Sequence, residues 1–208
     1  MPRPSLAELV APAHTAIVTQ ECQGAIVGPD SGLRELAEEA RREAIPNIAR
    51  VLDAGRAAGV KVVHSVVVRR ADGLGSNHNA RLFGGALSRG VVEIVPGSPA
   101  ASVIPELHPA DSDVVLSRWH GIGPMGGTDL DAVLRNLGVS TIVGMGVSVN
   151  VAIPNLVMDA VNAAYQVVLP RDAVAGIPRD YADAVIDNTL SLLATVTTAD
   201  EVIEAWSG

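Results

Sequence analysis

The chain alternates short apolar runs rich in Val and Ile with segments of helical periodicity, and this alternation limits the fold more than any other feature. Repeated strand and helix patterns are typical of a parallel sheet whose crossover helices cover both faces. The predicted strands are Thr15–Gln20, Val60–Val68, Asp113–Ser117, Ser140–Met145, Tyr165–Leu169 and Ala194–Thr197. The predicted helices are Ile45–Ala58, Asn79–Ser88, Asp129–Leu137, Val151–Ala164, Tyr181–Leu193 and Ala199–Trp206. We therefore expect an α/β fold, a three-layer α/β/α sandwich with a mostly parallel sheet of about six strands.

The length of 208 residues fits a single domain over residues 1–208. Apolar residues make up 48% of the chain and aromatic residues only 2%, so the core must consist of Val, Leu, Ile and Ala, which suit strands buried on both faces. A net charge of −8 without a basic run argues against a nucleic-acid partner, which requires clustered Lys and Arg. The chain has no run of about 18 apolar residues and no signal-peptide core at Met1–Ser5, so we expect no membrane contact and a cytoplasmic location.

Two segments interrupt the alternation. Ala71–Asn79 and Glu93–Asp111 are rich in Gly, Pro, Ser and Asn, so we expect loops there. Loops of this length are commonly functional. Because ligands of open parallel sheets bind beyond the carboxyl ends of the strands, the residues that directly follow each strand are the candidates for a site.

Three side chains at this edge are candidates for catalysis. Glu21 follows the first strand, where partial burial would raise its pKa and suit it to general acid or base chemistry. Arg118 follows the third strand, which we expect to lie next to the first. It remains charged, so it could bind an anion or form a structural ion pair with Glu21. His120 exchanges protons near neutral pH in an ordinary environment, although a histidine in a loop can equally be structural.

The turn after the fourth predicted strand is the candidate for binding. Gly144–Val149 lacks the third glycine of a dinucleotide fingerprint, and Leu169–Arg171 offers no acidic residue at the end of the next strand. Free N–H groups at the start of the following helix instead favour a cradle for an anion or a carbonyl oxygen; a turn that serves only packing is the alternative. The predicted substrate-binding residues are Gln23, His78, Asn79, Trp119, Val147, Ser148, Asn150, Val151 and Ala152. We expect no metal and no cofactor, since no close group of His, Asp and Glu is present.

Several segments carry a family resemblance. These are Thr15–Gln23, Ile45–Ala49 with Ala57–His64, Gly127–Asp131 with Leu134–Val139, Val143–Ala152, Asp159–Ala160 and Val167–Ala173. In this order they resemble the isochorismatase-like, or cysteine hydrolase, superfamily. The resemblance implies a parallel sheet between helices, a homodimer or homotetramer, and a non-proline cis peptide at Val147–Ser148.

The resemblance also implies a departure from the usual chemistry of the superfamily. Most members hydrolyse C–N bonds with an Asp, Lys and Cys triad. The matching positions here are Glu21, Ser117 or Arg118, and Ala152, and the only cysteine is Cys22. A thioester intermediate at position 152 is therefore excluded. By strand alternation Cys22 should point away from Glu21 into the core.

The leading hypothesis is a hydrolase that acts on a small, anionic metabolite by non-covalent acid/base catalysis. Glu21 would transfer the proton, Arg118 would anchor the substrate and His120 would assist. The alternative is a non-catalytic member that binds a metabolite or a partner and uses Glu21 and Arg118 as a structural pair. A third possibility is thiol chemistry at Cys22.

Overall fold

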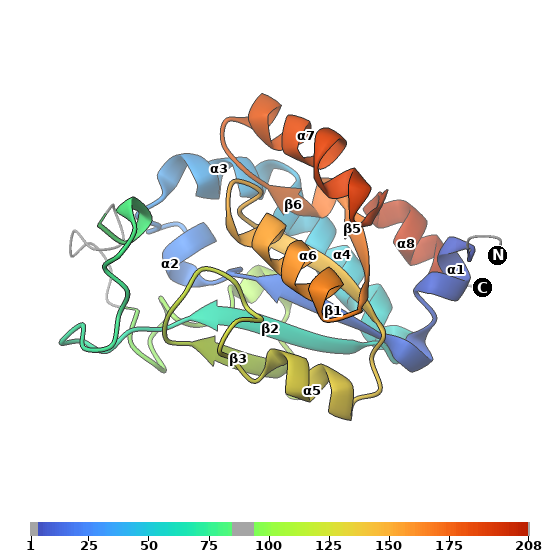
Figure 1. The fold of residues 1–208 in the computed structure, drawn as a ribbon, viewed down its shortest axis with the longest axis horizontal. Coiled ribbons are helices and arrows are strands. Elements are labelled where there is room, and N and C mark those ends of the chain that lie inside the picture. The colour runs from blue at the N-terminus through green and yellow to red at the C-terminus, as the bar shows by residue number, and fades with distance from the viewer. Residues whose placement is uncertain (1–3, 85–93, 208) are drawn as a thin grey trace.

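A single sheet forms the centre of the computed structural model, which describes residues 4–84 and 94–207 (Figure 1). Its seven strands follow the order β3-β2-β1-β4-β5-β7, with β6 paired to β4, and every recorded strand pair is parallel. The strands are β1 (Thr15–Gln20), β2 (Lys61–Val67), β3 (Val114–Arg118), β4 (Thr141–Val147), β5 (Gln166–Pro170), β6 (Val174–Ala175) and β7 (Thr195–Thr197).

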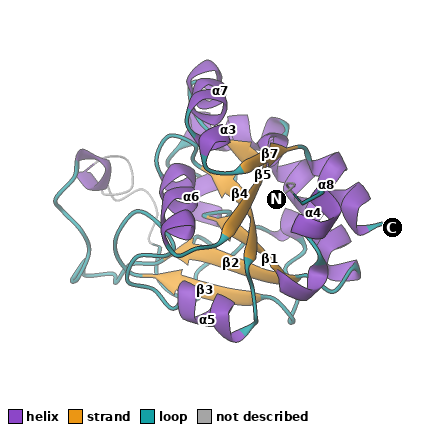
Figure 2. Cartoon of the chain, turned by 45° about the vertical axis from the view of Figure 1, so that its right-hand side comes forward, coloured by secondary structure: helices purple, strands orange, loops and turns teal. Residues whose placement is uncertain are grey.

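Helices cover both faces of the sheet (Figure 2). One layer holds α4 and α8, with α1 beside α8; the other holds α5, α6 and α7. The helices are α1 (Leu6–Leu9), α2 (Gly24–Val27), α3 (Arg34–Arg42), α4 (Ala44–Ala57), α5 (Leu130–Asn136), α6 (Ala152–Asn162), α7 (Arg179–Asn188) and α8 (Ala199–Trp206). The predicted sandwich with a mostly parallel sheet is confirmed.

The apolar runs of the central strands supply both cores. Every residue of β1 and β4 is buried. Because side chains alternate across a strand, Ile17 and Val143 pack in the cluster of α4 and α8, while Ala16 and Val18 pack in the cluster of α5 and α6. This arrangement explains why the strands are continuously apolar.

A buried polar network joins β1, β2 and the residue before β3. The Thr19 hydroxyl lies 2.7 Å from His64 Nδ1, and His64 Nε2 lies 3.2 Å from Asp113 Oδ2. Asp113 also accepts hydrogen bonds from Arg56 and from the Ala110 amide. These contacts link β1 and β2 to the residue that precedes β3.

Several elements differ from the sequence-based prediction. The sheet has a seventh, two-residue strand, β6, and α3 was not predicted. Of the predicted helix Asn79–Ser88, the structure describes a 3-10 helix at Arg81–Gly84, and the remainder lies outside the described residues. The helix predicted over Tyr181–Leu193 ends at Asn188 and is followed by a separate 3-10 helix.

No helix within residues 4–84 and 94–207 combines the length and the apolar character needed to span a membrane.

Candidate active site

The candidate site lies at the carboxyl edge of β1 and β4. The chain runs outward from β1 through β2 to β3 and then returns to place β4 on the other side of β1, and such a reversal opens a crevice at the strand ends. Gln20 pairs with Gly146, so both strands end at the same level. Glu21 and Ser148 therefore leave neighbouring strands at this crevice.

Glu21 has an unusual backbone conformation for a residue with a side chain. Its φ of 54° lies in the left-handed region, which non-glycine residues seldom adopt. The Glu21 amide donates to the Ser65 carbonyl at 2.9 Å, and the Ile104 amide donates to the Cys22 carbonyl at 3.1 Å. These contacts hold the turn in place, and strained residues of this kind occur frequently at functional sites.

Arg118 forms an ion pair with Glu21. Arg118 Nη2 donates to Glu21 Oε1, and the two side chains are 4% and 17% exposed. β2 separates β3 from β1, so Arg118 reaches across an intervening strand and not from the neighbouring strand that the sequence suggested. Ser117 is exposed, and Arg118 is therefore the residue that supplies the positive charge at the site.

The remaining donors of Arg118 also face inward. Nη1 donates to the carbonyl oxygens of His120 and Gly121, and Nε is enclosed without a partner among the described residues. The role of Arg118 as a substrate anchor stays a prediction; in this structure its guanidinium is engaged by Glu21 and by the following loop. Its geometry suits orientation of the Glu21 carboxylate.

Burial governs the protonation of this pair. Burial raises the pKa of Glu21, whereas Arg118, Gln20 and Arg69 act in the opposite direction. Burial lowers the pKa of Arg118, and Glu21 opposes that shift. Glu21 Oε1 accepts from Arg118 and from Gln20 Nε2, while no donor from the described residues contacts Oε2. Oε2 is thus the oxygen that is open to accept or deliver a proton.

Cys22 is separated from this chemistry. Its thiol donates to the Gln20 carbonyl at 3.6 Å and is 1% exposed. Burial, with the charge of Glu21, raises its pKa to about 12. Since the thiolate is the reactive form of cysteine, Cys22 is not a nucleophile in this conformation.

The turn between β4 and α6 has the predicted cis peptide at Val147–Ser148. It forms only part of the predicted cradle, because the Val149 amide donates to Ala175 and the Val151 amide to Ser148. Within the described chain, the amides of Asn150 and Ala152 have no recorded acceptor. Ala152 begins α6, and its methyl group is buried.

Two predicted binding side chains are structural. Gln23 is fully buried; its amide nitrogen donates to the carbonyls of Val67 and Ala100, and its oxygen accepts from the Val67 amide. The Asn150 side chain pairs with both backbone groups of Ile177. Their roles as ligands for substrate stay predictions, and in this structure each side-chain amide binds the backbone of a neighbouring segment.

The remaining predicted side chains lie on two loops beside the sheet edge. His78, Asn79, Trp119 and His120 are exposed. The His120 ring packs on Gly127, where a Cβ would lie 2.7 Å from Cε1. Prediction missed Asn77, whose side-chain oxygen accepts from the Gly121 amide at 2.6 Å and so joins the two loops. No sequence pattern identified this long-range contact.

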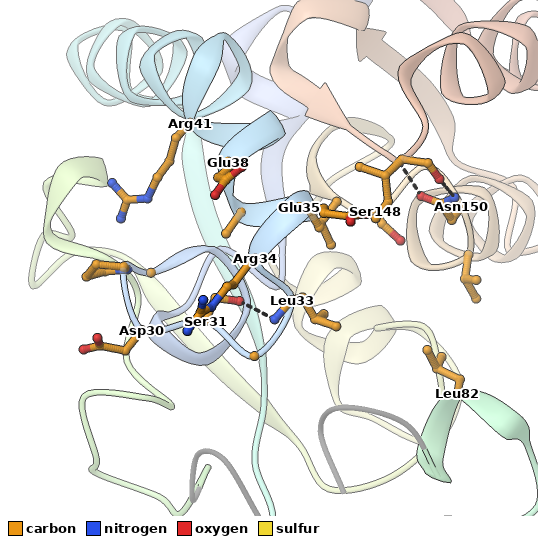
Figure 3. Close-up of a pocket in the computed structure, with 17 residues that line it drawn as sticks. Asp30, Ser31, Leu33, Arg34, Glu35, Glu38, Arg41, Leu82, Ser148 and Asn150 are labelled. Carbon is orange, nitrogen blue, oxygen red and sulfur yellow. Dashed lines mark hydrogen bonds between the residues drawn. The ribbon is translucent and has the colours of Figure 1, made fainter. Parts of the chain in front are cut away.

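Two cavities are lined in part by residues that follow the ends of the strands. A cavity of about 1110 Å³ lies between α3, the preceding loop and the β4–α6 turn; Ser148 and Asn150 line one side, and Arg34 and Glu38 line the other (Figure 3). A second cavity of about 340 Å³ is lined by residues that include Asn77, Asn79 and Gly121. Neither cavity is lined by Glu21 or Arg118.

No group of three or more His, Cys, Asp or Glu side chains within the described segments is arranged to hold a metal ion.

A parallel sheet between helix layers, with a carboxyl group at the β1–β4 crevice, defines the class of α/β proteins whose sites form at the ends of the strands. Residues 15–201 match the profile of the isochorismatase domain. The chain therefore belongs to the isochorismatase family.

Its relatives include named hydrolases. The chain is 26% identical over 204 residues to the ureidoacrylate amidohydrolase RutB of Rhizobium rhizogenes, covering 91% of this chain and 82% of the relative. It is 28% identical over 132 residues to the N-carbamoylsarcosine amidase of an Arthrobacter species, covering 62% and 48%. The crystal structure of a cysteine hydrolase from Pseudomonas syringae pv. phaseolicola superposes with a TM-score of 0.82 at 25% identity, covering 100% of this chain and 99% of that chain.

Proposed function

We propose that the chain is a hydrolase that acts on a small, anionic metabolite by acid/base catalysis at Glu21, without a covalent enzyme intermediate. The observation that carries this proposal is the pairing of Glu21 with Arg118 at the β1–β4 crevice, while the single thiol of the chain is buried and protonated. Membership of a family with hydrolytic relatives supports the reaction class.

The lack of an accessible thiol among the described residues argues for direct attack by water. Ala152 occupies the start of α6, the position that the resemblance assigns to the cysteine of the triad. Cys22 cannot replace it, because its thiol packs against the Gln20 carbonyl on the buried side of the turn. Neither residue supports a thioester intermediate.

Glu21 has the properties of a proton carrier. Burial raises its pKa above the usual value, and a carboxyl group with a raised pKa is suited to general acid or base catalysis. In the reaction, Oε2 would give its proton to the leaving atom as that atom separates from carbon. Water would supply the hydroxyl group to the same carbon, and its remaining proton would return to Glu21. Substrate and water are consumed, and the carboxyl group is regenerated.

The substrate would bind against the β4–α6 turn. The free amides of Asn150 and Ala152 lie at the start of an eleven-residue helix, whose dipole favours a negative charge there. The adjoining cavity of about 1110 Å³ provides room for a small metabolite. The names of the amidohydrolase and amidase relatives favour a substrate with a ureido or carbamoyl group.

A non-catalytic binding function is the second candidate. The engagement of Arg118 by Glu21 and by two loop carbonyls favours it, because a purely structural pair would have the same contacts. On this alternative, Arg118→Met would lower thermal stability equally with and without a co-purified metabolite. A ligand-dependent difference in the melting temperature would favour a site that binds substrate.

The test of the proposal is mass spectrometry of a metabolite extract incubated with the wild-type protein or with Glu21→Gln. We expect at least one species to gain water or to be cleaved only by the wild type. Identical conversion by both proteins would refute the role of Glu21. A metabolite that co-purifies unchanged with both proteins would favour the binding function.

A further inference from the structure

Gln20 is a polar residue at a buried position. It is the last residue of β1 and is 0% exposed. By alternation it shares its face of the strand with Ala16 and Val18, which pack in the apolar cluster of α5 and α6. An apolar side chain is therefore the expected occupant of this position.

The hydrogen bonds of the Gln20 side chain are unequal. Its Nε2 donates to Glu21 Oε1 at 3.0 Å, whereas its carbonyl oxygen is enclosed without a partner among the described residues. An enclosed, unpaired carbonyl costs free energy that an apolar side chain would avoid. The Gln20 amide is therefore less favourable for stability than an apolar side chain would be at this position. Its recorded side-chain hydrogen bond is made to Glu21.

We propose that Gln20 is a positioning residue for this site: its amide holds Glu21 Oε1 beside Arg118 and so leaves Oε2 as the oxygen that exchanges the proton. This inference rests on the proposed function of Glu21 and extends it to the residue that orients the carboxyl group. Two donors from different strands, β1 and β3, fix the same carboxylate oxygen, which restricts rotation of the group.

The charged groups around Glu21 determine how removal of the Gln20 side-chain amide would change the pKa of Glu21. Arg118 from β3 and Arg69 after β2 face the carboxyl group, and the protonated thiol of Cys22 is adjacent in the chain. Gln20 adds a neutral donor that favours the ionised form of Glu21. Without this donor, burial would act with less opposition, and Glu21 would hold its proton to a higher pH.

The experiment is a pH titration of glutamate side-chain ¹³C carboxyl resonances by NMR. Glu21→Gln identifies the resonance of Glu21, Gln20→Met removes the amide, and Gln166→Met at the exposed start of β5 is the matched control. We expect a higher titration midpoint for Glu21 in Gln20→Met and an unchanged midpoint in Gln166→Met. An unchanged midpoint in Gln20→Met would overturn the inference.

Thermal melting separates positioning from a structural role. Gln20→Met replaces an unpaired carbonyl by an apolar group of similar length, so we expect a melting temperature at or above that of the wild type. A clearly lower melting temperature, reproduced by Gln20→Leu, would assign Gln20 to stability and contradict the inference.

The titration requires no substrate, so the two proposals fail in different ways. If Glu21→Gln abolishes turnover but Gln20→Met leaves the midpoint unchanged, the positioning role is wrong and the proposed function stands. If Glu21→Gln retains full turnover, the proposed function is wrong whatever the midpoint shows, and Gln20 then has no catalytic group to position.

Discussion

At the scale of single residues, Glu21 and Cys22 are neighbours in sequence with opposite chemical environments. The left-handed backbone of Glu21 turns its carboxyl group toward Arg118, whereas Cys22 enters the core beside Gly146. The alternation of side chains along a strand predicted that Cys22 would point away from Glu21 and into the core. It could not predict that Arg118 faces inward, because the carbonyls that hold Arg118 belong to an irregular loop.

The buried thiol provides the first prediction. Cys22 in the native protein should resist iodoacetamide at pH 8, because its pKa is raised to about 12 by burial and the reagent requires thiolate. Intact-mass measurement checks this result, and the protein unfolded in guanidinium, which should gain one adduct, is the control. Rapid labelling of the native protein would contradict this prediction and would support the alternative that Cys22 performs thiol chemistry.

The Glu21–Arg118 pair provides the second prediction. Arg118→Met should destabilise the fold by about 3 kcal/mol, since removing one partner leaves a buried carboxyl group without its counter-charge. Chemical denaturation measures this loss. Arg70→Met is the control, because Arg70 pairs with Asp72 at the exposed surface and its loss should change stability little. An equal loss of unfolding free energy in both variants would show that the buried pair stabilises the fold no more than the exposed pair does.

At the scale of elements, the sequence predicted the strands well and some helices poorly. β1 and α8 have the predicted bounds, because strong apolar runs or a clear capping box mark them. α3 was missed because only Leu36, Ala37 and Ala40 of its nine residues are buried and its first turn has no side-chain cap. The structural roles of Gln23 and Asn150 were also unpredictable, since their partners lie far away in sequence.

The close approach of β1 and β4 leads to the third prediction. Gly146 has a φ of 113°, and a Cβ there would lie 2.3 Å from the Gln20 carbonyl oxygen. Gly146→Ala should therefore cost about 2 kcal/mol or more of unfolding free energy. Gly138→Ala is the matched control: Gly138 has a φ of 72° in open space, so backbone conformation alone should cost about 1 kcal/mol. A smaller loss for Gly146→Ala would contradict the contact.

The His64 network leads to a fourth prediction, on pH. Burial lowers the pKa of His64 below its usual 6.5, although Asp113 opposes the shift. His64 in the unfolded chain therefore binds a proton more readily than in the folded protein. The contribution of His64 to stability is fully present above about pH 6.5 and is lost as the pH falls below that value.

Asp113, the partner of His64, titrates in a different range. Burial acts to raise the pKa of Asp113, but hydrogen bonds from Arg56, Ala110 and His64 hold it below its usual value. The Asp113 contribution therefore declines only in stronger acid.

Urea denaturation between pH 7.5 and pH 5 measures the His64 effect. Relative to wild type, His64→Asn should flatten the pH dependence in this interval. His108→Asn, which changes an exposed histidine, is the control variant. An identical pH dependence in His64→Asn and in the wild type would contradict the assignment.

At the scale of the whole molecule, the parallel sheet explains why the candidate site could be found from sequence. All the strands deliver their carboxyl ends to the same edge, so residues after β1, β3 and β4 converge without any knowledge of contacts. The cavities depend on α3 and on loop geometry, which local sequence patterns do not determine. A homodimer or homotetramer stays a prediction, and sedimentation velocity tests it.

The central claim concerns which residue transfers the proton. Once a turned-over metabolite is identified, kcat/KM should be compared among the wild type, Glu21→Gln and Cys22→Ala. We predict a loss of about 10²- to 10⁴-fold for Glu21→Gln, the usual contribution of one acid/base group, and near wild-type activity for a folded Cys22→Ala. The reverse result, activity retained in Glu21→Gln and abolished in a folded Cys22→Ala, would contradict non-covalent acid/base catalysis at Glu21.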